Sequence, residues 1–203
     1  MARIRVLVAH PDLAHSRVSR ALLGAARAAG RSGAVEVDDL YARYPDYLID
    51  AAAEQDRLRD VDLLVWVHPI HWYGMPPLMK LWLDEVFAFG WAYGPGGQAL
   101  RGCDLWLVTS TGGPQDSYRH DGYNRYPFDA FLPPYEQTAT LAGMRFLPPM
   151  VLHGAHRVGD AEIADHAATF AARLRHYPDW PELEMLDECV ACEVPADARR
   201  LPA

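Results

Sequence analysis

The stretch that decides the fold runs over residues 63–93 and reads L-L-V-W-V-H-P-I-H-W-Y-G-M-P-P-L-M-K-L-W-L-D-E-V-F-A-F-G-W-A-Y. It opens with five consecutive apolar residues, which is typical of a strand buried on both faces of a sheet. Polar and aromatic residues follow where a solvated loop is expected, and Pro76 and Pro77 then begin an amphipathic helix. Because ligands bind outside the carboxyl ends of the strands in an open parallel sheet, this aromatic loop predicts a site for a large planar ligand.

Strand-like and helix-like segments alternate along the rest of the chain. We expect strands over residues 4–9, 35–39, 63–67, 104–109 and 144–152, the last one interrupted by Pro148 and Pro149. We expect helices over residues 17–29, 50–60, 77–89, 135–142 and 160–174. This alternation predicts an α/β fold with a doubly wound, five-stranded parallel sheet. The absence of G-x-G-x-x-G after the first strand favours the flavodoxin-like order 2-1-3-4-5 over a six-stranded dinucleotide-binding fold. Residues 1–177 would form this domain, and residues 178–203 a tail without a core pattern.

The composition excludes several classes of function. The 203 residues include 19 basic and 27 acidic side chains, and the formal net charge of −8 argues against a general nucleic-acid binder. No apolar run is long enough to cross a bilayer and the first residues lack a cleavable signal pattern, so we expect a cytoplasmic protein. Three cysteines argue against a complete disulfide framework. Cys189 and Cys192 form a C-x-x-C pair after no predicted strand, and we interpret it as incidental, with redox sensing as the alternative.

Loops after the first, third and fourth predicted strands would converge on one edge of such a sheet. After the first strand, candidate residues surround a predicted helix N-terminus, whose free backbone N–H groups and partial positive charge bind phosphate. These candidates are His10, Ser16, Arg17, Val18 and Ser19. The alternative is ordinary helix capping by Ser16, with a histidine that bonds to the backbone.

The loop after the third predicted strand offers a wall for a ring system. Its candidates are Ile70, His71, Trp72 and Tyr73, whose backbone N–H groups could bind ring heteroatoms. The alternative is that the two large aromatic side chains pack in the core or in a dimer interface. His68 and His71 lack the spacing of a helical metal-ligand pair, so we expect no metal site.

The loop after the fourth predicted strand consists of Ser110, Thr111, Gly112 and Gly113. Glycines let the backbone approach a ligand closely, and the hydroxyl groups before them can reach its polar atoms. A T-G-G sequence alone often marks only a turn. Its position directly after a strand, at the same sheet edge as the aromatic loop, favours a binding loop.

Several further motifs extend this pattern over about residues 3–176. They are H-P at His10, Y-P-D from Tyr44, A-A-E-Q from Ala52, the long H-P-I-H-W-Y-G-M-P-P-L-M-K-L-W-L-D-E-V-F from His68, F-G-W-A-Y-G from Phe89, T-G-G from Thr111 and L-P-P from Leu147. In this combination the chain resembles the NAD(P)H:quinone oxidoreductases of flavodoxin-like fold. Among them it is most similar to the ancillary subunits of glutathione-gated potassium-efflux systems.

The resemblance implies a bound flavin, FMN or alternatively FAD, with its phosphate on His10 and residues 16–19 and its ring on residues 70–73 and 110–113. It implies that NAD(P)H and a quinone are the small-molecule partners and that two electrons pass between them as a hydride. It also implies that Tyr118, five residues after the second glycine, and His120 contact the quinone or nicotinamide. Our hypothesis is that these side chains donate a proton to the quinone, and the alternative for Tyr118 is a loop aromatic residue packed on the sheet edge. Members of the family usually carry asparagine in place of Ser19 and lysine in place of Cys103, so one donor on the phosphate side is shorter here.

Two other functions are consistent with these residues. One is a regulatory subunit that binds and activates a membrane potassium-efflux transporter, which would place the protein peripherally at the inner membrane. The other is a flavodoxin-type one-electron carrier, which the long segment 114–134, a candidate substrate lid, argues against. The helix expected at 77–89 is apolar on more than one side, which indicates a homodimer.

Overall fold

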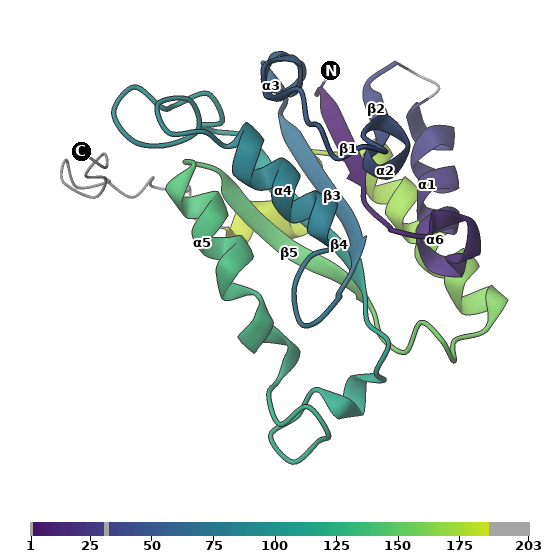
Figure 1. Ribbon diagram of the computed structural model, residues 1–203. Helices are drawn as coiled ribbons and strands as arrows, with labels where there is room; N and C mark the ends of the chain where they lie inside the picture. Colours follow the sequence, from purple (N-terminus) through teal and green to yellow (C-terminus); the bar gives the residue numbers. More distant parts are fainter. Residues whose placement is uncertain (1, 31–32, 187–203) are drawn as a thin grey trace.

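The computed structural model describes residues 2–30 and 33–186. Five parallel strands form one twisted sheet in the order β2-β1-β3-β4-β5, so the predicted fold class and strand order are confirmed (Figure 1). The strands are β1 (Ile4–Val8), β2 (Val35–Asp39), β3 (Leu63–Pro69), β4 (Asp104–Ser110) and β5 (Arg145–Leu152). Strand order reverses between β1 and β3, which is where ligands bind in doubly wound sheets.

Helices cover both faces of the sheet (Figure 1). The α-helices are α1 (Arg17–Ala29), α2 (Leu40–Arg43), α3 (Ala51–Leu58), α4 (Pro77–Val86), α5 (Pro133–Leu141) and α6 (Asp160–His176). The short 3-10 helices are η1 (Leu13–His15), η3 (Gln115–Ser117), η4 (Phe128–Phe131) and η5 (Pro181–Met185). The sequence pattern missed α2, a single turn that begins because the Asp39 carboxylate accepts hydrogen bonds from the N–H groups of Tyr41 and Ala42.

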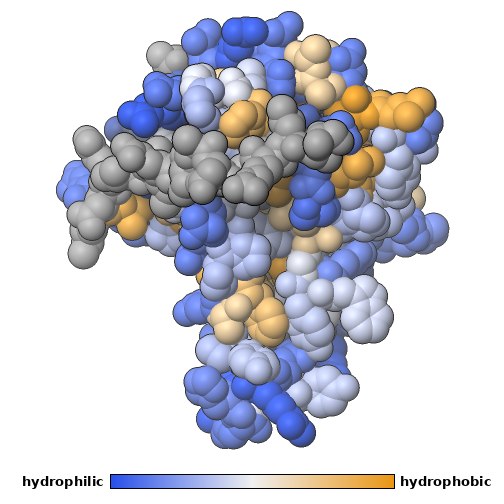
Figure 2. Space-filling model, turned by 60° about the vertical axis from the view of Figure 1, so that its left-hand side comes forward, coloured by the Kyte–Doolittle hydropathy of each residue, from blue (hydrophilic) through white to orange (hydrophobic). Residues whose placement is uncertain are grey.

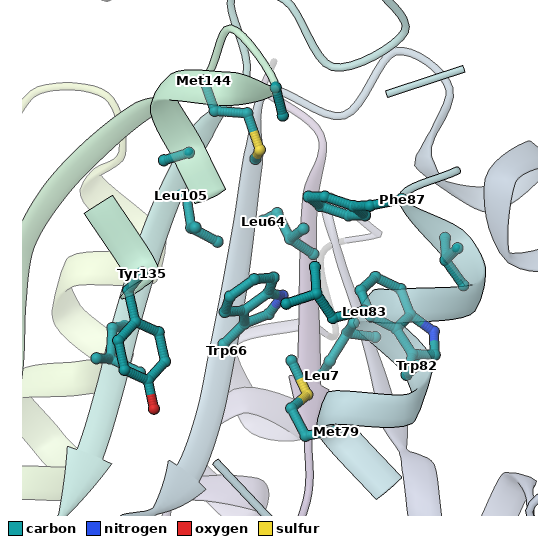
Figure 3. Packing of buried hydrophobic residues seen from close by; sticks show 14 of the residues in the cluster. Leu7, Leu64, Trp66, Met79, Trp82, Leu83, Phe87, Leu105, Tyr135 and Met144 are labelled. Atoms are coloured by element: carbon teal, nitrogen blue, oxygen red, sulfur yellow. The ribbon is translucent and has the colours of Figure 1, made fainter. Parts of the chain in front are cut away.

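Two hydrophobic clusters hold the layers together. In one cluster α1 and α6 pack on one face of the sheet, and in the other α4 and α5 pack on the opposite face. The second cluster centres on Trp66, Trp82 and Phe87, which lie side by side between β3 and α4 (Figure 3). The apolar side chains of α4 are therefore mostly covered within one chain: Leu78, Met79, Trp82, Leu83 and Val86 are all buried. The apolar surface of α4, from which the sequence indicated a homodimer, is largely buried in this core.

The strand β5 runs through the two prolines that were expected to interrupt it. Its register against β4 shifts between Trp106 and Val108, so Pro148 and Pro149 together lie opposite one residue of β4. This bulge is tolerated because β5 is an edge strand, where a missing N–H donor costs least. The Trp106 indole N–H donates to the Pro148 carbonyl over 3.1 Å and so holds the bulge in place.

Packed structure continues beyond residue 177, where no core pattern was expected. Trp180 and Leu183 are buried, and the Trp180 ring lies 4.8 Å from that of Trp106. The Trp180 indole N–H donates to the carbonyl of Arg173 in α6 over 2.9 Å. Cys189 and Cys192 lie outside the described residues. Among the helices that are described, none has the length and apolar character needed to cross a bilayer.

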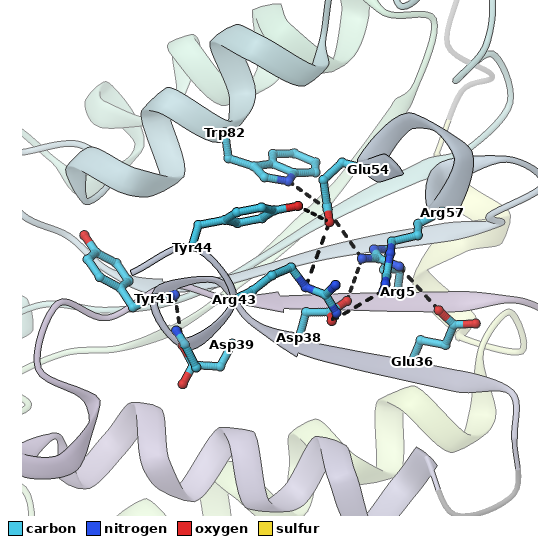
Figure 4. A network of polar contacts seen from close by, with 11 residues as sticks. Arg5, Glu36, Asp38, Asp39, Tyr41, Arg43, Tyr44, Glu54, Arg57 and Trp82 are labelled. Carbon is cyan, nitrogen blue, oxygen red and sulfur yellow. Dashed lines mark hydrogen bonds and ion pairs between the residues drawn. The ribbon is translucent and has the colours of Figure 1, made fainter. Parts of the chain in front are cut away.

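A buried ion network fastens β1 and β2 to the helices α2 and α3 (Figure 4). Arg5 is 1% exposed and lies 2.6 Å from Asp38 and 3.4 Å from Glu54. Glu54 is fully buried and also accepts hydrogen bonds from Tyr44 (2.8 Å) and from the indole of Trp82 (2.9 Å). Burial lowers the pKa of Arg5, while attraction by Glu54 opposes that shift. The network therefore stabilises the fold and lies apart from the loops that carry the candidate site.

Candidate functional site

The loops at the carboxyl ends of the strands are hydrogen-bonded to one another. The Ala9 N–H donates to Val67, and the Ile70 N–H donates to Ser110 over 2.8 Å. The Thr111 N–H in turn donates to Leu152 over 3.0 Å. The structure thus brings the three predicted loops together and adds a fourth, the loop after β5, to the same edge.

A cavity of about 370 Å³ lies among these loops, within the size range of small-ligand sites. Most of the predicted binding residues line it: His10, Ser16, Arg17, Val18, Ile70, His71, Ser110, Thr111 and Gly112. Ser19, a buried residue of the first turn of α1, does not line it. Trp72, Tyr73 and Gly113 line a second cavity, of about 260 Å³, which shares Ile70 with the first.

The N-terminus of α1 forms one end of the larger cavity. Ser16 caps the helix, since its hydroxyl oxygen accepts a hydrogen bond from the Ser19 N–H over 3.1 Å. The N–H groups of Arg17 and Val18, in the first turn, have no acceptor within the helix and face the helix end. The Arg17 guanidinium lies beside this end in an exposed ion pair with Asp160 at 2.6 Å. Free donors and a helix dipole together suit a phosphate group.

His10 is oriented as a neutral hydrogen-bond donor toward this cavity. The Asp12 N–H donates to its Nδ1 over 3.0 Å, so the Nε2 atom of the neutral ring carries the proton. Burial and then the neighbouring His71 lower the pKa of His10, whereas Asp12 acts in the opposite direction. The two imidazole rings lie 6.0 Å apart at an angle of 68°.

The aromatic loop after β3 is a tight turn in an uncommon conformation. His71 and Gly74 exchange N–H···O bonds of 2.9 and 3.0 Å, and Trp72 and Tyr73 between them have φ values of 48° and 63°. Positive φ at both central residues defines a type I′ turn, which normally takes asparagine or glycine. Trp72 is 96% exposed, so the turn presents a large ring to solvent at the mouth of the second cavity. Strained backbone of this kind is common at ligand sites.

The second cavity is closed on its far side by the segment between β4 and α5, which projects from the body as a largely hydrophilic lobe (Figure 2). The Tyr73 ring stacks on Phe131 of the lobe at 5.2 Å, and its hydroxyl donates to Asn124 over 3.4 Å. Tyr118 also lines this cavity. Burial raises the pKa of Tyr118, and a hydrogen bond with the Thr111 side chain opposes that shift.

His120 is exposed on the lobe and lines neither cavity. Three residues that the sequence analysis did not name do lie at the site. Asn124 lines the second cavity, His156 lines the first, and His153 lies 3.0 Å from the Thr111 hydroxyl. A signal for the two histidines was present in the sequence, because H-G-A-H directly follows the fifth predicted strand. A side chain at Gly112 would come within 3.3 Å of the His156 ring, so glycine keeps this wall of the cavity open.

The five-stranded parallel sheet in the order 2-1-3-4-5 defines a protein of flavodoxin-like fold, and the cavities lie at the edge where such a fold binds ligands. Comparison with known proteins agrees with this fold class. The chain belongs to the family of flavodoxin-like fold whose model matches residues 2–175.

Individual relatives share most of their length with this chain. It is 41% identical over 173 residues to the glutathione-regulated potassium-efflux system ancillary protein KefG of Salmonella paratyphi B, covering 85% of this chain and 93% of that protein. It is similar to general stress protein 14 of Treponema denticola, solved in complex with FMN (TM-score 0.79, 37% identity, 85% of this chain and 97% of that chain). It is also similar to a Klebsiella pneumoniae protein named "Putative quinone reductase" (TM-score 0.74, 26% identity, 88% of this chain and 86% of that chain).

Proposed function

We propose that this protein is an FMN-dependent oxidoreductase that transfers two electrons from NAD(P)H to a quinone. The observation that carries the proposal is the pair of adjoining cavities at the switch point of the sheet. One has the donors of a phosphate site, and the other is lined by aromatic residues that include Tyr118, whose hydroxyl a quinone oxygen could meet. Two solved relatives, one with FMN and one named as a quinone reductase, support this assignment.

The chemistry of the lining residues suits FMN. Arg17, Val18 and His10 would hold the phosphate, and residues 70–73 and 110–113 would hold the ring. FMN when bound would supply the hydride chemistry, and the protein would supply position and hydrogen bonds. The FMN-bound relative favours FMN over FAD.

Tyr118 is the proposed proton donor to the quinone. The phenol is protonated at neutral pH, so that the proton is available when negative charge develops on the substrate oxygen. His120 is a second candidate donor, but its exposed position on the lobe makes it the weaker one.

The proposal is tested by measuring two half-reactions separately by stopped-flow absorbance. NAD(P)H should bleach the bound flavin, and 1,4-benzoquinone should restore it. Tyr118→Phe should slow the second step by about tenfold or more and leave flavin content and the first step unchanged, because only proton donation is lost. Loss of flavin in Tyr118→Phe would contradict the donor role, and bleaching that only one-electron acceptors reverse would favour an electron carrier.

A second function is favoured by the 41% identity with KefG, which extends over 93% of that protein. On this account the chain is an ancillary subunit that binds a membrane potassium-efflux transporter and is peripheral to the inner membrane through that partner. Both functions can reside in one protein. Co-purification with a tagged transporter of this class, and potassium efflux measured with and without the chain, tests the regulatory role independently of quinone turnover.

We also propose that the protein is a homodimer. A groove of about 630 Å³ lies between α4 and α5, and its lining includes Leu141, Tyr93 and the 42% exposed Phe89. A second copy would cover these apolar side chains. Light scattering of the wild type and of Phe89→Glu should give a dimer and a monomer respectively, and a wild-type monomer at all concentrations would contradict the proposal.

A further inference from the structure

We propose that Asn124 binds a carbonyl oxygen of the quinone through its side-chain NH2 group, and that the Tyr73 hydroxyl orients this amide. The inference rests on the proposed function and adds a substrate-binding residue to the second cavity. Nothing in the sequence pattern pointed to Asn124, which is the only asparagine of the chain. Its role follows from the fold of the lobe, from one side-chain hydrogen bond and from the cavity that it lines.

The backbone of the lobe holds Asn124 at a fixed place. The Asn124 N–H donates to the Ser117 carbonyl over 2.9 Å, and the Arg125 N–H donates to Gly122 over 3.1 Å. Gly122 lies against the short helix η3, because a Cβ added there would come within 2.5 Å of the Asp116 carbonyl oxygen. These contacts fold this part of the lobe into a compact turn, so the Asn124 side chain starts from a defined position.

Tyr73 orients the amide from the loop after β3. Its hydroxyl donates to Asn124 Oδ1 over 3.4 Å, and its ring stacks on Phe131 at 5.2 Å and 21°. The hydrogen bond is long for an O–H···O contact, so it directs the amide without holding it tightly. With the amide oxygen turned to Tyr73, the NH2 group of Asn124 points away from that hydroxyl.

The NH2 group is left free to bind a ligand in the second cavity. Asn124 is half-buried and lines that cavity, of about 260 Å³, together with Tyr118. Within residues 2–30 and 33–186, no acceptor is hydrogen-bonded to its Nδ2 atom. An amide nitrogen donates two hydrogen bonds and accepts none, so it suits a ligand with a carbonyl oxygen.

A quinone matches the other properties of this cavity. None of the eight described residues that line it carries a charge, and a quinone is a neutral, planar molecule whose polar groups are carbonyl oxygens. The quinone takes up a hydride from the flavin and the proton of Tyr118 to become the hydroquinone, while Asn124 keeps both of its side-chain hydrogens. Negative charge that develops on the quinone oxygen strengthens the N–H···O bond during this step. Asn124 therefore favours reduction as well as binding.

Asn124→Asp is the sharpest variant, because the two side chains have nearly the same shape. The carboxylate still accepts from the Tyr73 hydroxyl, but it replaces the NH2 donor by a charged acceptor. The probe is duroquinone, whose four ring methyl groups prevent addition of thiols. In FMN-loaded protein, the variant should raise the Kd of duroquinone by about tenfold or more and slow flavin reoxidation, because one hydrogen bond is lost and repulsion is added. Flavin content and reduction by NADPH should stay unchanged.

Three further variants separate the donor from charge and packing. Asn124→Ala removes the donor without adding charge, so its Kd should lie between those of the wild type and Asn124→Asp. Tyr73→Phe keeps the ring on Phe131 but removes the orienting hydroxyl, and should weaken duroquinone binding less than Asn124→Ala. Asp129→Asn makes the reverse exchange at an exposed residue of the lobe that lines neither cavity, and should change nothing.

Two results with these variants would overturn the role of Asn124. One is an equal Kd and an equal reoxidation rate in the wild type, Asn124→Asp and Asn124→Ala. The other is a loss confined to reduction by NADPH, which would show that the amide binds the nicotinamide instead. An unchanged Kd in Tyr73→Phe would contradict the orienting role of the hydroxyl.

A measurement on the wild type decides even if a variant does not fold. Because Asn124 is the only asparagine, protein labelled with ¹⁵N-asparagine gives a single pair of side-chain NH2 signals in ¹H–¹⁵N NMR. Adding duroquinone to oxidised, FMN-loaded protein should move one proton of that pair downfield, as a new hydrogen bond requires. A pair that does not move at saturating duroquinone would overturn the proposal.

The same experiments distinguish this inference from the proposed function. If the wild type binds no flavin or does not reduce duroquinone, the proposed function fails and the role of Asn124 fails with it. If the wild type and both Asn124 variants reduce duroquinone at equal rates, the proposed function stands and only the role of Asn124 fails.

Discussion

At the scale of single residues, the aromatic loop of the site contains strained backbone. Trp72 has φ 48° in a turn position that favours asparagine, and its side chain is 96% exposed. Trp72→Asn should therefore stabilise the protein by about 1 kcal/mol in urea unfolding, because the αL strain is relieved and almost no burial is lost. It should also raise the KM for the quinone, because the ring lines the second cavity.

Trp72→Ala is the matched control, since it removes the ring but keeps a Cβ at positive φ. We expect the same loss of quinone affinity as in Trp72→Asn and a smaller gain in stability. Equal stability of the two variants would mean that the turn is not strained.

His68 makes the stability of the fold depend on pH. It is 1% exposed, its Nδ1 lies 2.9 Å from the Pro69 carbonyl, and its ring stacks on Tyr135 at 5.8 Å. Burial lowers the pKa of His68 from 6.5 to about 4. Between those values only the unfolded chain binds the proton, so the stabilisation is present above pH 6.5 and is lost as the pH falls toward 4.

The contribution of His68 should amount to about 3 kcal/mol over that interval, from about 1.4 kcal/mol per pKa unit. His68→Phe keeps the ring on Tyr135 and cannot titrate, so its free energy of unfolding should fall less steeply with acid. Urea unfolding of both proteins at several values from pH 7.5 to pH 5 measures the difference. Parallel pH dependence in the two proteins would show that another group is responsible.

At the scale of elements, the buried ion network joins strands and helices that are far apart in the sequence. Glu54 of α3 is fully buried and is bonded to Tyr44, Trp82 and Arg5. Glu54→Gln should lower the free energy of unfolding by about 3 kcal/mol or more, because it leaves a buried guanidinium short of a counter-charge.

Glu36→Gln is the control within the same network. Glu36 also lies 3.3 Å from Arg5, but its side chain is 59% exposed, so its loss should cost about 1 kcal/mol or less. Chemical denaturation of both variants gives the comparison. Similar losses would mean that Arg5 relies on Asp38 rather than on Glu54.

The sequence predicted those elements whose pattern is repetitive. Five apolar residues from Leu63 predicted a buried strand, and Ser16 was identified as a helix cap from its residue type alone. The single turn α2 was missed because it depends on one carboxylate, and β5 was expected to break because its edge position cannot be read from Pro148 and Pro149. Elements of this kind depend on tertiary context.

The part of the site that could be predicted follows from one rule, that ligands bind outside the carboxyl ends of parallel strands. That rule named the residues that line the larger cavity, but it was applied to three loops and not to the loop after β5, so His153 and His156 were missed. The lobe has no periodic pattern, and nothing in its sequence shows that Tyr118 faces the cavity while His120 is exposed. Such orientations follow from ring packing, as between Tyr118 and Phe131.

At the scale of the whole molecule, the proposed flavin would lie with its phosphate in the first cavity and its ring on the loops that line both cavities. Binding of that ligand to the native state alone should stabilise the protein, by about 2.7 kcal/mol when the free ligand is at a hundred times its dissociation constant. Adding FMN should therefore raise the Tm in a concentration-dependent way, and riboflavin, which lacks the phosphate, should raise it less. Equal shifts would mean that Arg17 and Val18 do not bind the phosphate.

The central claim is that this edge holds a flavin that accepts electrons from NAD(P)H. The most direct measurement is the absorbance spectrum of the purified protein before and after NADPH or NADH, with the cofactor released by heat and identified by mass. We predict a flavin spectrum that bleaches with nicotinamide, recovers with benzoquinone, and releases FMN. A colourless protein that takes up neither FMN nor FAD on reconstitution would contradict the account and leave the regulatory subunit as the better description.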